Sequence, residues 1–329
     1  MKKRIAIIGA GISGLALAQR LKNLADVVVF EKARGVGGRM STRYAEPFYF
    51  DHGTQFFTAR SKAFQDYIAP LITKGLIAEW KGKVITYQAD KTLKDRLWFE
   101  PHYVAVPHMN SLGKHMAEEI DVRLNTEIAA LGEKRADGWH LLSKDGTMLG
   151  IFDWVISTAP PAQTLNLFKA ILPDDSTLHH ARLQGCFTLM IGFHSPWAKP
   201  WMAAKVHESP IEWIAVNSTK PGRNKDVTAI VVHSRNDWAD EHLEDDLQQT
   251  QEYLVQQFED VTGIACDKAD YLSMHRWKYA IVLENEKKGY HLDPHNNIAA
   301  TGDWASVSRI EAAWLNAVSL ATAIGKAIR

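Results

Sequence analysis

The sequence predicts an α/β fold in which a Rossmann-like domain that binds a dinucleotide is combined with a second domain built on a mixed or antiparallel sheet. Three observations predict this fold. An apolar segment at residues 4–8 is followed at once by a Gly-x-Gly-x-x-Gly motif at residues 9–14. A second apolar segment ends in Glu31, twenty residues after the second glycine of the motif. A third apolar segment, residues 298–300, leads into Asp303 and a long helical pattern.

Length and composition set the broad class of the protein. The 329 residues suggest two domains, and 46% apolar with 23% charged residues is typical of globular proteins. Lysine and arginine number 38, as do aspartate and glutamate, so there is no basic excess for binding nucleic acid or an anionic membrane. Two cysteines, Cys186 and Cys266, cannot form a disulfide framework, and no apolar run reaches the ~18 residues of a membrane span. We therefore expect a cytoplasmic protein.

The N-terminal segment permits two interpretations. Three basic residues precede an apolar run, as in a signal peptide. The phase of the glycines, a matching strand at residues 27–30 and its terminal Glu31 instead favour a strand, a tight turn and a helix. In such a turn Gly9 allows the sharp bend, Gly11 lets the backbone approach a pyrophosphate, and Gly14 lets the helix pack closely on the strand. The helix N-terminus then supplies N–H donors to the pyrophosphate.

Three further features select FAD over NAD as the dinucleotide. A second glycine-rich segment follows Glu31 and is bracketed by Arg34 and Arg39, so it can fold over the same pyrophosphate with Arg39 as its charge partner. Asp303, between the last strand and a helix over residues 307–327, can bind a ribityl chain. The interval between the two ends of the chain is also too long for a simple NAD domain. Because both cysteines lie far from the C-terminal turn, we expect FAD to be bound noncovalently.

Seven segments together resemble the flavin-dependent amine oxidase superfamily, which has the p-hydroxybenzoate-hydroxylase-like fold, and within it the bacterial renalases. The segments follow the order of that family over nearly the whole chain. They are residues 9–14, 31–40, 50–57, 213–223, 232–233, 275–280 and 301–304. The resemblance implies that Gln55 and Phe56 lie beside the isoalloxazine ring and that the backbone near Ile128 faces the adenine.

The glycine motif and the resemblance together give the expected cofactor contacts. These are Gly9, Gly11, Ile12, Ser13, Gly14, Glu31, Lys32, Arg34, Gly38, Arg39, Gln55, Phe56, Ile128, Gly302, Asp303 and Ile310. Ordinary explanations stay open for three features of the sequence. In those explanations Arg34 is a solvated surface charge, Asp303 is a helix N-cap, and residues 51–54 form a simple turn.

The chain order predicts that the FAD-binding domain is discontinuous. We expect it to comprise residues 1–58, 101–161 and 297–329, and the substrate domain to comprise residues 59–100 and 162–296. The elements expected in the FAD-binding domain are helices over residues 15–24 and 109–119, strands at 122–124 and 154–158, and a hairpin-like stretch with turns at 137–138 and 145–146. Those expected in the substrate domain are strands at 187–193, 211–216, 227–233 and 271–276, and an amphipathic helix over 240–258.

Other chemistries find no support in the sequence. A single Gly-x-Gly-x-x-Gly motif without paired cysteines argues against a disulfide reductase. None of the 14 histidines belongs to a set with metal-ligand spacing, so we expect no metal site. The Gly-x-Ser-x-Gly motif of serine hydrolases is absent as well.

Four residues are candidates for the substrate site. The resemblance places Asn217, His233 and Trp277 in the space above the flavin, and Trp213 lies on the predicted strand that leads to Asn217. Flat indoles can hold a planar ring against the flavin, with Asn217 and His233 orienting its carboxamide. For each of these residues a structural role in the sheet is the alternative. The basic segment 220–225 either meets substrate phosphates or is an ordinary exposed turn.

The resemblance implies an FAD-dependent oxidase of isomeric dihydronicotinamides. The 2- or 6-dihydro forms of NAD(P) pass hydride to the flavin and leave as NAD(P)+, and dioxygen is converted to hydrogen peroxide. Loss of hydride yields an aromatic pyridinium, so no strong general base is required. Two alternatives are an oxidase of a small amine and a noncatalytic binding protein. The amine is less favoured because we expect that Trp277 and Tyr279 do not line one aromatic cage. The expected partners are a small-molecule substrate and dioxygen, without nucleic acid or membrane.

Overall fold

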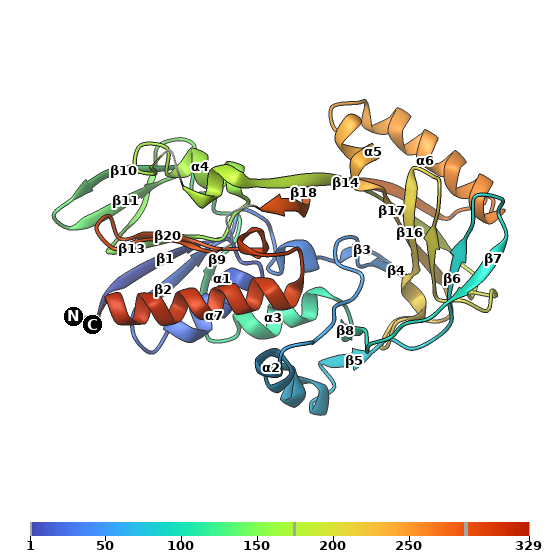
Figure 1. The fold of residues 1–329 in the computed structure, drawn as a ribbon, viewed down its shortest axis with the longest axis horizontal. Helices are drawn as coiled ribbons and strands as arrows, with labels where there is room; N and C mark the ends of the chain where they lie inside the picture. Colours follow the sequence, from blue (N-terminus) through green and yellow to red (C-terminus); the bar gives the residue numbers. More distant parts are fainter. Residues whose placement is uncertain (1, 174–175, 286–288, 329) are drawn as a thin grey trace. The chain divides into compact units, whose positions relative to one another are not determined.

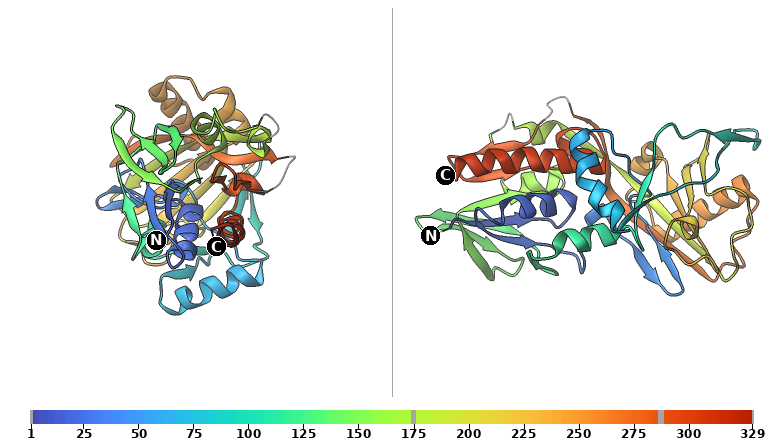
Figure 2. Two further views of the ribbon diagram at one scale, coloured as in Figure 1. Left: turned by 90° about the vertical axis from the view of Figure 1, so that its left-hand side faces the viewer. Right: turned by 90° about the horizontal axis from the view of Figure 1, so that it is seen from below.

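The computed structural model describes residues 2–173, 176–285 and 289–328. The chain divides into two compact units, each with its own sheet and core. Unit 1 comprises Met1–Gly38, Leu112–Leu183 and Val282–Arg329, and unit 2 comprises Arg39–Ser111 and Gln184–Ile281. Both ends of the chain therefore belong to unit 1 (Figure 2).

Unit 1 is built on a six-stranded sheet with the order β19-β20-β13-β1-β2-β9 (Figure 1). The strands from β20 to β9 are parallel, and β19 pairs antiparallel with β20. Their bounds are β1 Arg4–Ile8, β2 Asp26–Phe30, β9 Asp121–Arg123, β13 Trp154–Ser157, β19 His291–Asp293 and β20 Ile298–Ala300. In this order the carboxyl ends of β1 and β2 lie side by side, which is where parallel sheets of this class bind dinucleotides.

Helices cover one face of this sheet, and a small antiparallel sheet covers the other. Helix α1 (Ile12–Leu21) packs against α7 (Ile310–Ala327) on the first face (Figure 2). On the other face Ala6 and Val155 share a core with Trp139 and Phe152 of a three-stranded meander. Further elements of this unit are β10 Ala130–Arg135, β11 Gly138–Leu142, β12 Met148–Phe152, α4 Pro161–Leu167 and the 3-10 helices η2 Thr177–His180 and η4 Asp303–Ala305.

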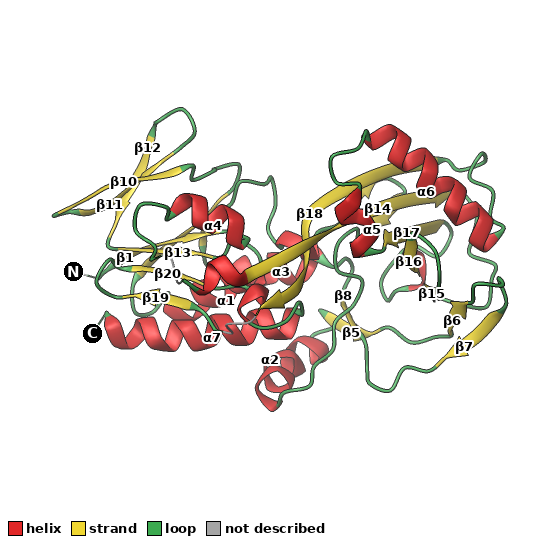
Figure 3. Ribbon diagram, turned by 45° about the horizontal axis from the view of Figure 1, so that its top comes forward, coloured by secondary structure: helices red, strands yellow, loops and turns green. Residues whose placement is uncertain are grey.

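Unit 2 is built on a seven-stranded mixed sheet with the order β18-β14-β17-β16-β15-β6-β7. Strands β15 and β6 pair in parallel, whereas β14, β17, β16 and β15 pair antiparallel in turn. Helix α6 (Leu247–Thr262) covers one face, where Leu254 and Phe258 pack on Ile214 and Phe187 (Figure 3). The strands are β6 Val84–Tyr87, β7 Leu93–Arg96, β14 Ala181–Phe193, β15 Ala203–Val206, β16 Ile211–Val216, β17 Thr228–Ser234 and β18 Tyr271–Asn285.

A hairpin on the other face of this sheet positions the segment that follows it. Phe48 and Phe50 of the hairpin share a core with Met190 and Val231 of the sheet, so residues 51–57 leave β4 from a fixed point. The remaining elements are β3 Arg43–Ala45, β4 Phe48–Phe50, β5 Ile77–Glu79, β8 Tyr103–Ala105, α2 Lys62–Thr73, α3 Asn110–Ala117, α5 Asn236–Glu241, η1 Gly38–Met40 and η3 Asn217–Thr219. The predicted α/β class, with its parallel sheet and its mixed sheet, is confirmed.

The bounds of the two units differ from those predicted for the two domains. Residues 39–58 and 101–111 belong to unit 2, because the β3–β4 hairpin packs on its sheet and β8 pairs with β5. Residues 162–183 and 282–296 belong to unit 1. Phe168 and Leu178 lie in the core under its sheet, and β19 extends that sheet. Long-range packing of this kind leaves no local mark in the sequence.

The single helix expected over residues 240–258 is wrong. The structure forms α5 up to Glu241 and begins α6 at Leu247. Asp246 is the N-cap of α6, because its carboxylate accepts hydrogen bonds from the backbone N–H groups of Gln248 and Gln249, at 2.9 and 3.0 Å. The carbonyls between the two helices accept hydrogen bonds from Arg276, a partner that a helical periodicity cannot reveal.

Candidate dinucleotide and substrate sites

The glycine motif forms a turn whose shape depends on two of its three glycines. Gly9 has φ +102°, and a Cβ there would lie 2.7 Å from the Thr158 hydroxyl. A Cβ on Gly14 would lie 1.9 Å from the Gly9 carbonyl oxygen, so α1 approaches β1 this closely only without a side chain. A Cβ on Gly11 would meet no atom within 4 Å. Gly11 therefore borders open space at the N-terminus of α1, which suits a pyrophosphate.

The second glycine segment packs backbone to backbone on the first. The Gly37 N–H donates to the Ala10 carbonyl over 2.8 Å. A Cβ on Gly38, which has φ +55°, would lie 3.2 Å from the α-carbon of Gly11. On the other side of the segment, a Cβ on Gly113 would lie 2.8 Å from the α-carbon of Gly37. The glycines of both segments thus allow two loops to close around one space.

Glu31 joins these two loops through its carboxylate. Its Oε2 accepts a hydrogen bond from the Ala10 N–H, and its Oε1 accepts one from the Ala33 N–H, both at 2.8 Å. The residue is buried, with 9% of its surface exposed. Each carboxylate oxygen can accept a further hydrogen bond, so the pair remains able to hold the hydroxyls of a ribose.

Asp303 is buried directly after β20 in the same unit. Its Oδ2 accepts a hydrogen bond from the Ser308 hydroxyl at 2.8 Å, and the Asn316 amide donates to the Gly302 carbonyl at 2.9 Å. The helix expected from about residue 307 begins at Ile310 instead, after the 3-10 turn that contains Asp303. The role of Asp303 as a cofactor contact stays a proposal.

The other expected contacts in unit 1 fall into two groups. Lys32 and Arg34 are exposed, and the Lys32 ammonium lies 3.4 Å from the Gln163 side-chain oxygen. Ser13 is buried, and its hydroxyl donates to the Ala313 carbonyl at 3.1 Å. That hydroxyl fastens α1 to α7, and the expected contact of Ser13 with the cofactor stays a proposal. The buried apolar contacts are Ile12, Ile128 and Ile310.

The residues of unit 1 fit a bound dinucleotide. Helix α1 has no side-chain cap at Gly11, so the first N–H groups of its ten residues are left for a ligand. Within the described residues, the buried Thr301 hydroxyl makes no hydrogen bond, and it lies next to Gly302 and Asp303. The uncapped start of α1 offers N–H groups to a pyrophosphate, and Glu31 offers acceptors to a ribose. The Thr301 hydroxyl is a further group that a bound ligand would satisfy.

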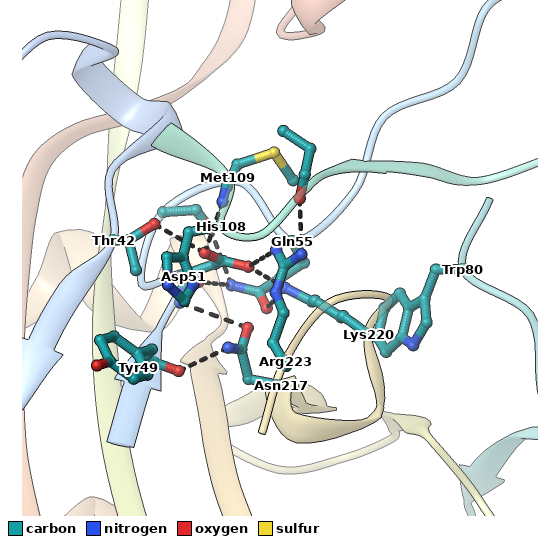
Figure 4. Close-up of polar contacts among 12 residues, drawn as sticks. Thr42, Tyr49, Asp51, Gln55, Trp80, His108, Met109, Asn217, Lys220 and Arg223 are labelled. Atoms are coloured by element: carbon teal, nitrogen blue, oxygen red, sulfur yellow. Dashed lines mark hydrogen bonds and ion pairs between the residues drawn. The ribbon is translucent and has the colours of Figure 1, made fainter. Parts of the chain in front are cut away.

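Unit 2 contains a buried ionic cluster centred on Asp51 (Figure 4). Its carboxylate accepts hydrogen bonds from Arg223 at 2.6 Å, Lys220 at 3.1 Å, the Met109 N–H at 2.9 Å and the Thr42 hydroxyl at 2.8 Å. Asp51 and Lys220 have no exposed surface. Burial alone raises the pKa of Asp51, but the two cations and the Met109 N–H hold it well below its usual range.

The buried positions of Lys220 and Arg223 correct the sequence-based expectation for the basic segment. Neither side chain is free to meet a substrate phosphate, because both are bound to Asp51; in that segment Lys225 is exposed. Burial lowers the pKa of Lys220 to about 8, against the opposing effect of Asp51. The sequence marked both ends of the cluster, but a separation of 169 positions along the chain hides the pairing of Asp51 with Lys220.

Asn217 is fully buried and does not border open space. Its amide donates to the Tyr49 carbonyl at 2.6 Å, and its side-chain oxygen accepts from the Asp51 N–H at 3.4 Å. These contacts tie η3 to the end of β4. Asn217 thus positions the Asp51 loop, and its expected contact with a substrate carboxamide stays a proposal.

Gln55, His233 and Trp277 lie in one hydrogen-bonded chain. The Gln55 amide lies 3.2 Å from His233 Nε2, and the Trp277 indole donates to the His52 carbonyl at 3.1 Å. The rings of His52 and Trp277 stack, with centroids 5.3 Å apart. Arg39, also in unit 2, donates to the Ala280 carbonyl at 2.8 Å.

Phe56 and Trp213 belong to an aromatic cluster that sequence reasoning recognised only in part. Their ring centroids are 5.9 Å apart, and Trp98 lies 5.2 Å from Phe56. Trp98 stacks on His102 with centroids 3.6 Å apart. The Trp213 indole nitrogen is buried, and none of the described groups accepts a hydrogen bond from it. Trp98 and His102 were not anticipated, because an exposed loop rich in charge surrounds them in the sequence.

The expectation about Trp277 and Tyr279 is wrong. Both lie in the uninterrupted strand β18, and residues two apart on a strand project from the same face. The two side chains can therefore contribute to one wall, and their spacing no longer weighs against a small amine as substrate.

Lowering the pH is expected to destabilise the protein through His233. Burial lowers the pKa of His233 to about 4, from 6.5 for the free side chain. As the pH falls below 6.5 the unfolded chain takes up this proton first, so the free energy of unfolding decreases until the pH reaches about 4. At pH 5 the loss is about 2 kcal/mol.

Urea unfolding of the wild type and of His233→Gln, each at pH 7 and pH 5, measures this contribution. The change in unfolding free energy between the two pH values should be smaller in the variant by that amount. An equal change in both proteins would show that the pKa of His233 is the same in the folded and unfolded states.

Two kinds of feature are absent from the described part of the chain. Among residues 2–173, 176–285 and 289–328, no group of three or more His, Cys, Asp or Glu side chains is arranged to hold a metal ion. Over the same ranges, none of the helices combines the length and the hydrophobicity that crossing a bilayer requires. Both cysteines are buried, and burial raises the pKa of Cys186 to about 12.

Known proteins resemble this chain in two ways. Residues 7–71 match the NAD(P)-binding Rossmann-like domain family. A 4,4'-diapophytoene desaturase (4,4'-diaponeurosporene-forming) of Staphylococcus aureus strain Newman is 41% identical over 76 residues, which cover 20% of this chain. The match covers 15% of the length of that desaturase, so this chain corresponds to only a small part of it.

Solved structures match over the whole chain. A candidate protoporphyrinogen oxidase from Exiguobacterium sp. 255-15 has a TM-score of 0.80 at 14% identity, and the match covers 99% of both chains. Cyclohexylamine oxidase from Brevibacterium oxydans IH-35A has a TM-score of 0.74 at 14% identity, again over 99% of both chains. The chain therefore shares its fold with these two oxidases. At this level of identity the likeness establishes the fold, and the chemistry has to be argued from the residues.

Proposed function

We propose that this protein is an FAD-dependent oxidase of the flavin amine oxidase superfamily, and that its substrates are the 2- or 6-dihydro isomers of NAD(P), as in renalases. When bound, FAD supplies the oxidising chemistry: it accepts a hydride from the dihydropyridine, which leaves as the aromatic NAD(P)+, and two electrons then pass to dioxygen, which with two protons becomes hydrogen peroxide. The paired glycine loops and Glu31 support the cofactor.

The uncharged state of the polar groups around Trp277 supports a dihydronicotinamide as the substrate. Burial lowers the pKa of His233 to about 4 and that of His52 to about 3, so both imidazoles are uncharged at neutral pH. The carboxylate of Asp51 forms ion pairs with Lys220 and Arg223, so it cannot pair with a substrate ammonium. Removing hydride from a dihydropyridine needs a flat wall rather than a charge or a strong base, and Trp277 and Trp213 supply indoles for such a wall.

A small amine is the second candidate, and two observations favour it. The fold is shared with cyclohexylamine oxidase and with putrescine oxidase bound to putrescine, the latter at a TM-score of 0.75 and 13% identity. Trp277 and Tyr279 also project from one face of β18, as a pair flanking an amine requires.

Anaerobic mixing with a panel of donors distinguishes these functions. The panel contains 6-dihydro-NAD, 2-dihydro-NAD, their phosphorylated forms, ordinary β-NADH and small amines, and the flavin absorbance is followed by stopped flow. Rapid bleaching by a dihydro isomer, with slow or no bleaching by amines, is the expected result. Bleaching by amines alone would replace the proposed substrate and keep the proposed cofactor. A protein purified without flavin, and unable to bind added FAD, would favour a noncatalytic binding protein.

The cofactor assignment is tested separately by Glu31→Ala. Losing a carboxylate that accepts hydrogen bonds should weaken FAD binding about 10- to 100-fold, which corresponds to roughly 1.5–3 kcal/mol. The measurement is the flavin content of the purified protein and its titration with FAD. Glu133→Ala, at an exposed position of β10, is the matched control and should bind FAD as the wild type does. Near-normal flavin content in Glu31→Ala would contradict the assignment.

A further inference from the structure

The amide of Gln55 is held in one orientation by its neighbours. Its Nε2 faces three groups, the carbonyl oxygens of Asp51 and Gly53, the second at 3.0 Å, and the ring of His233, and its two hydrogens are shared among them. Its Oε1 accepts a hydrogen bond from the Lys220 ammonium at 3.2 Å. The reversed amide would place an oxygen against two carbonyl oxygens and a nitrogen against an ammonium, and would leave all three groups without a complement. The group that Gln55 turns toward His233 is therefore an N–H.

This orientation dictates where His233 carries its proton. Its Nε2 lies 3.2 Å from Gln55 Nε2, and because an amide nitrogen only donates, the imidazole nitrogen has to accept. A neutral imidazole that accepts at Nε2 carries its hydrogen on Nδ1. The His52 carbonyl accepts a hydrogen bond from His233, and it also accepts one from Trp277.

The ammonium of Lys220 anchors this series of hydrogen bonds. Lys220 has no exposed surface and is bound to Asp51, which in turn is bound to Arg223. The ammonium that orients Gln55 is thereby held in place. Besides burial, the positive charge of Lys220 also lowers the pKa of His233, and the ring of His52 is uncharged at neutral pH.

We propose that Gln55, anchored by Lys220, is a positioning residue that fixes His233 in its Nδ1–H tautomer and so holds the His52 carbonyl that binds the Trp277 indole. His233 then has no free donor or acceptor for proton transfer, and it is a link between Gln55 and Trp277 rather than a general base. The effect of Gln55 on turnover rests on the proposed function, in which the Trp277 indole holds the substrate ring. The position of that indole then depends on Gln55. The tautomer itself is independent of the substrate.

The test is the ring-nitrogen spectrum of His233 in the purified holoprotein labelled with 15N-histidine. The His233→Gln variant assigns the signals. In the wild type at neutral pH we expect Nδ1 to bear the proton and Nε2 to show the shift of an unprotonated nitrogen. A proton on Nε2 in the wild type would overturn the proposal without the need for any variant.

Gln55→Glu is the decisive variant because it keeps the shape of Gln55 and removes its N–H. A carboxylate at this position only accepts, so Nε2 of His233 should become protonated and its 15N signal should shift to the protonated position. Gln249→Glu makes the same chemical change at an exposed position of α6 and should leave the His233 signals unchanged. An unprotonated Nε2 retained in Gln55→Glu would overturn the proposal. If the tautomer changes as expected while no dihydronicotinamide bleaches the flavin, the proposed function fails and this inference stands.

Discussion

Replacing Asp51 by alanine is expected to lower the free energy of unfolding by about 3–5 kcal/mol, because it leaves two buried cations without their counter-ion. Lys220 is fully buried and 7% of Arg223 is exposed, so water cannot replace the lost carboxylate. The change also removes the acceptors of the Met109 N–H and the Thr42 hydroxyl. The measurement is urea unfolding at pH 7, followed by tryptophan fluorescence.

Asp66→Ala is the matched control for this prediction. Asp66 is paired with Lys62 on the surface of α2, where both side chains are largely exposed. Exposed pairs of this kind contribute about 0–1 kcal/mol, so the control should unfold close to the wild type. Equal losses in the two variants would show that the cluster around Asp51 is hydrated, contrary to its burial.

Gly14→Ala is expected to give the second large effect. The new methyl group would lie 1.9 Å from the Gly9 carbonyl oxygen, which belongs to rigid backbone. Helix α1 has to move away from β1, and strain of this kind costs about 1–3 kcal/mol of stability or more. The same movement displaces the N–H groups at the start of α1, so the variant should also lose FAD. Urea unfolding and flavin content measure the two effects.

Gly11→Ala separates stability from cofactor binding. A methyl group there meets no atom within 4 Å, and Gly11 has an ordinary extended conformation with φ −74°. We expect a normal unfolding free energy and a lower flavin content, because the methyl group occupies the space for the pyrophosphate. A flavin content equal to that of the wild type would show that no ligand approaches Gly11.

The dinucleotide-binding half could be predicted from the sequence because its signals are local. Strand β1, the glycine turn, α1 and β2 occupy the first thirty residues in an unbroken order, and Glu31 follows directly. Each glycine acts on atoms close to it in the chain or on one neighbouring strand, so spacing alone predicts the turn. Four of the seven strands of the mixed sheet are also predicted, with Ile211–Val216 at the expected bounds, because buried strands are continuous apolar runs.

The interior of unit 2 could not be predicted because its contacts join distant segments. Asp51 meets Met109, Lys220 and Arg223, and no periodicity connects those positions. Isolated charged residues are mostly exposed, so Lys220 in a Pro-Gly context was interpreted as part of a surface loop. The break between α5 and α6 was missed for a related reason. Asp246 favours the start of a new helix, whereas the apolar periodicity favours one continuous helix. The periodicity alone does not show which of the two forms.

The carboxylate of Glu31 has a consequence for selectivity between nucleotides. Two backbone N–H groups hold it in place before any ligand arrives, so its negative charge is a permanent part of the site. A ribose with a free 2′-hydroxyl can donate to it, whereas a 2′-phosphate would meet like charge. If the substrate is itself a phosphorylated dinucleotide, this one carboxylate discriminates against it at the cofactor position.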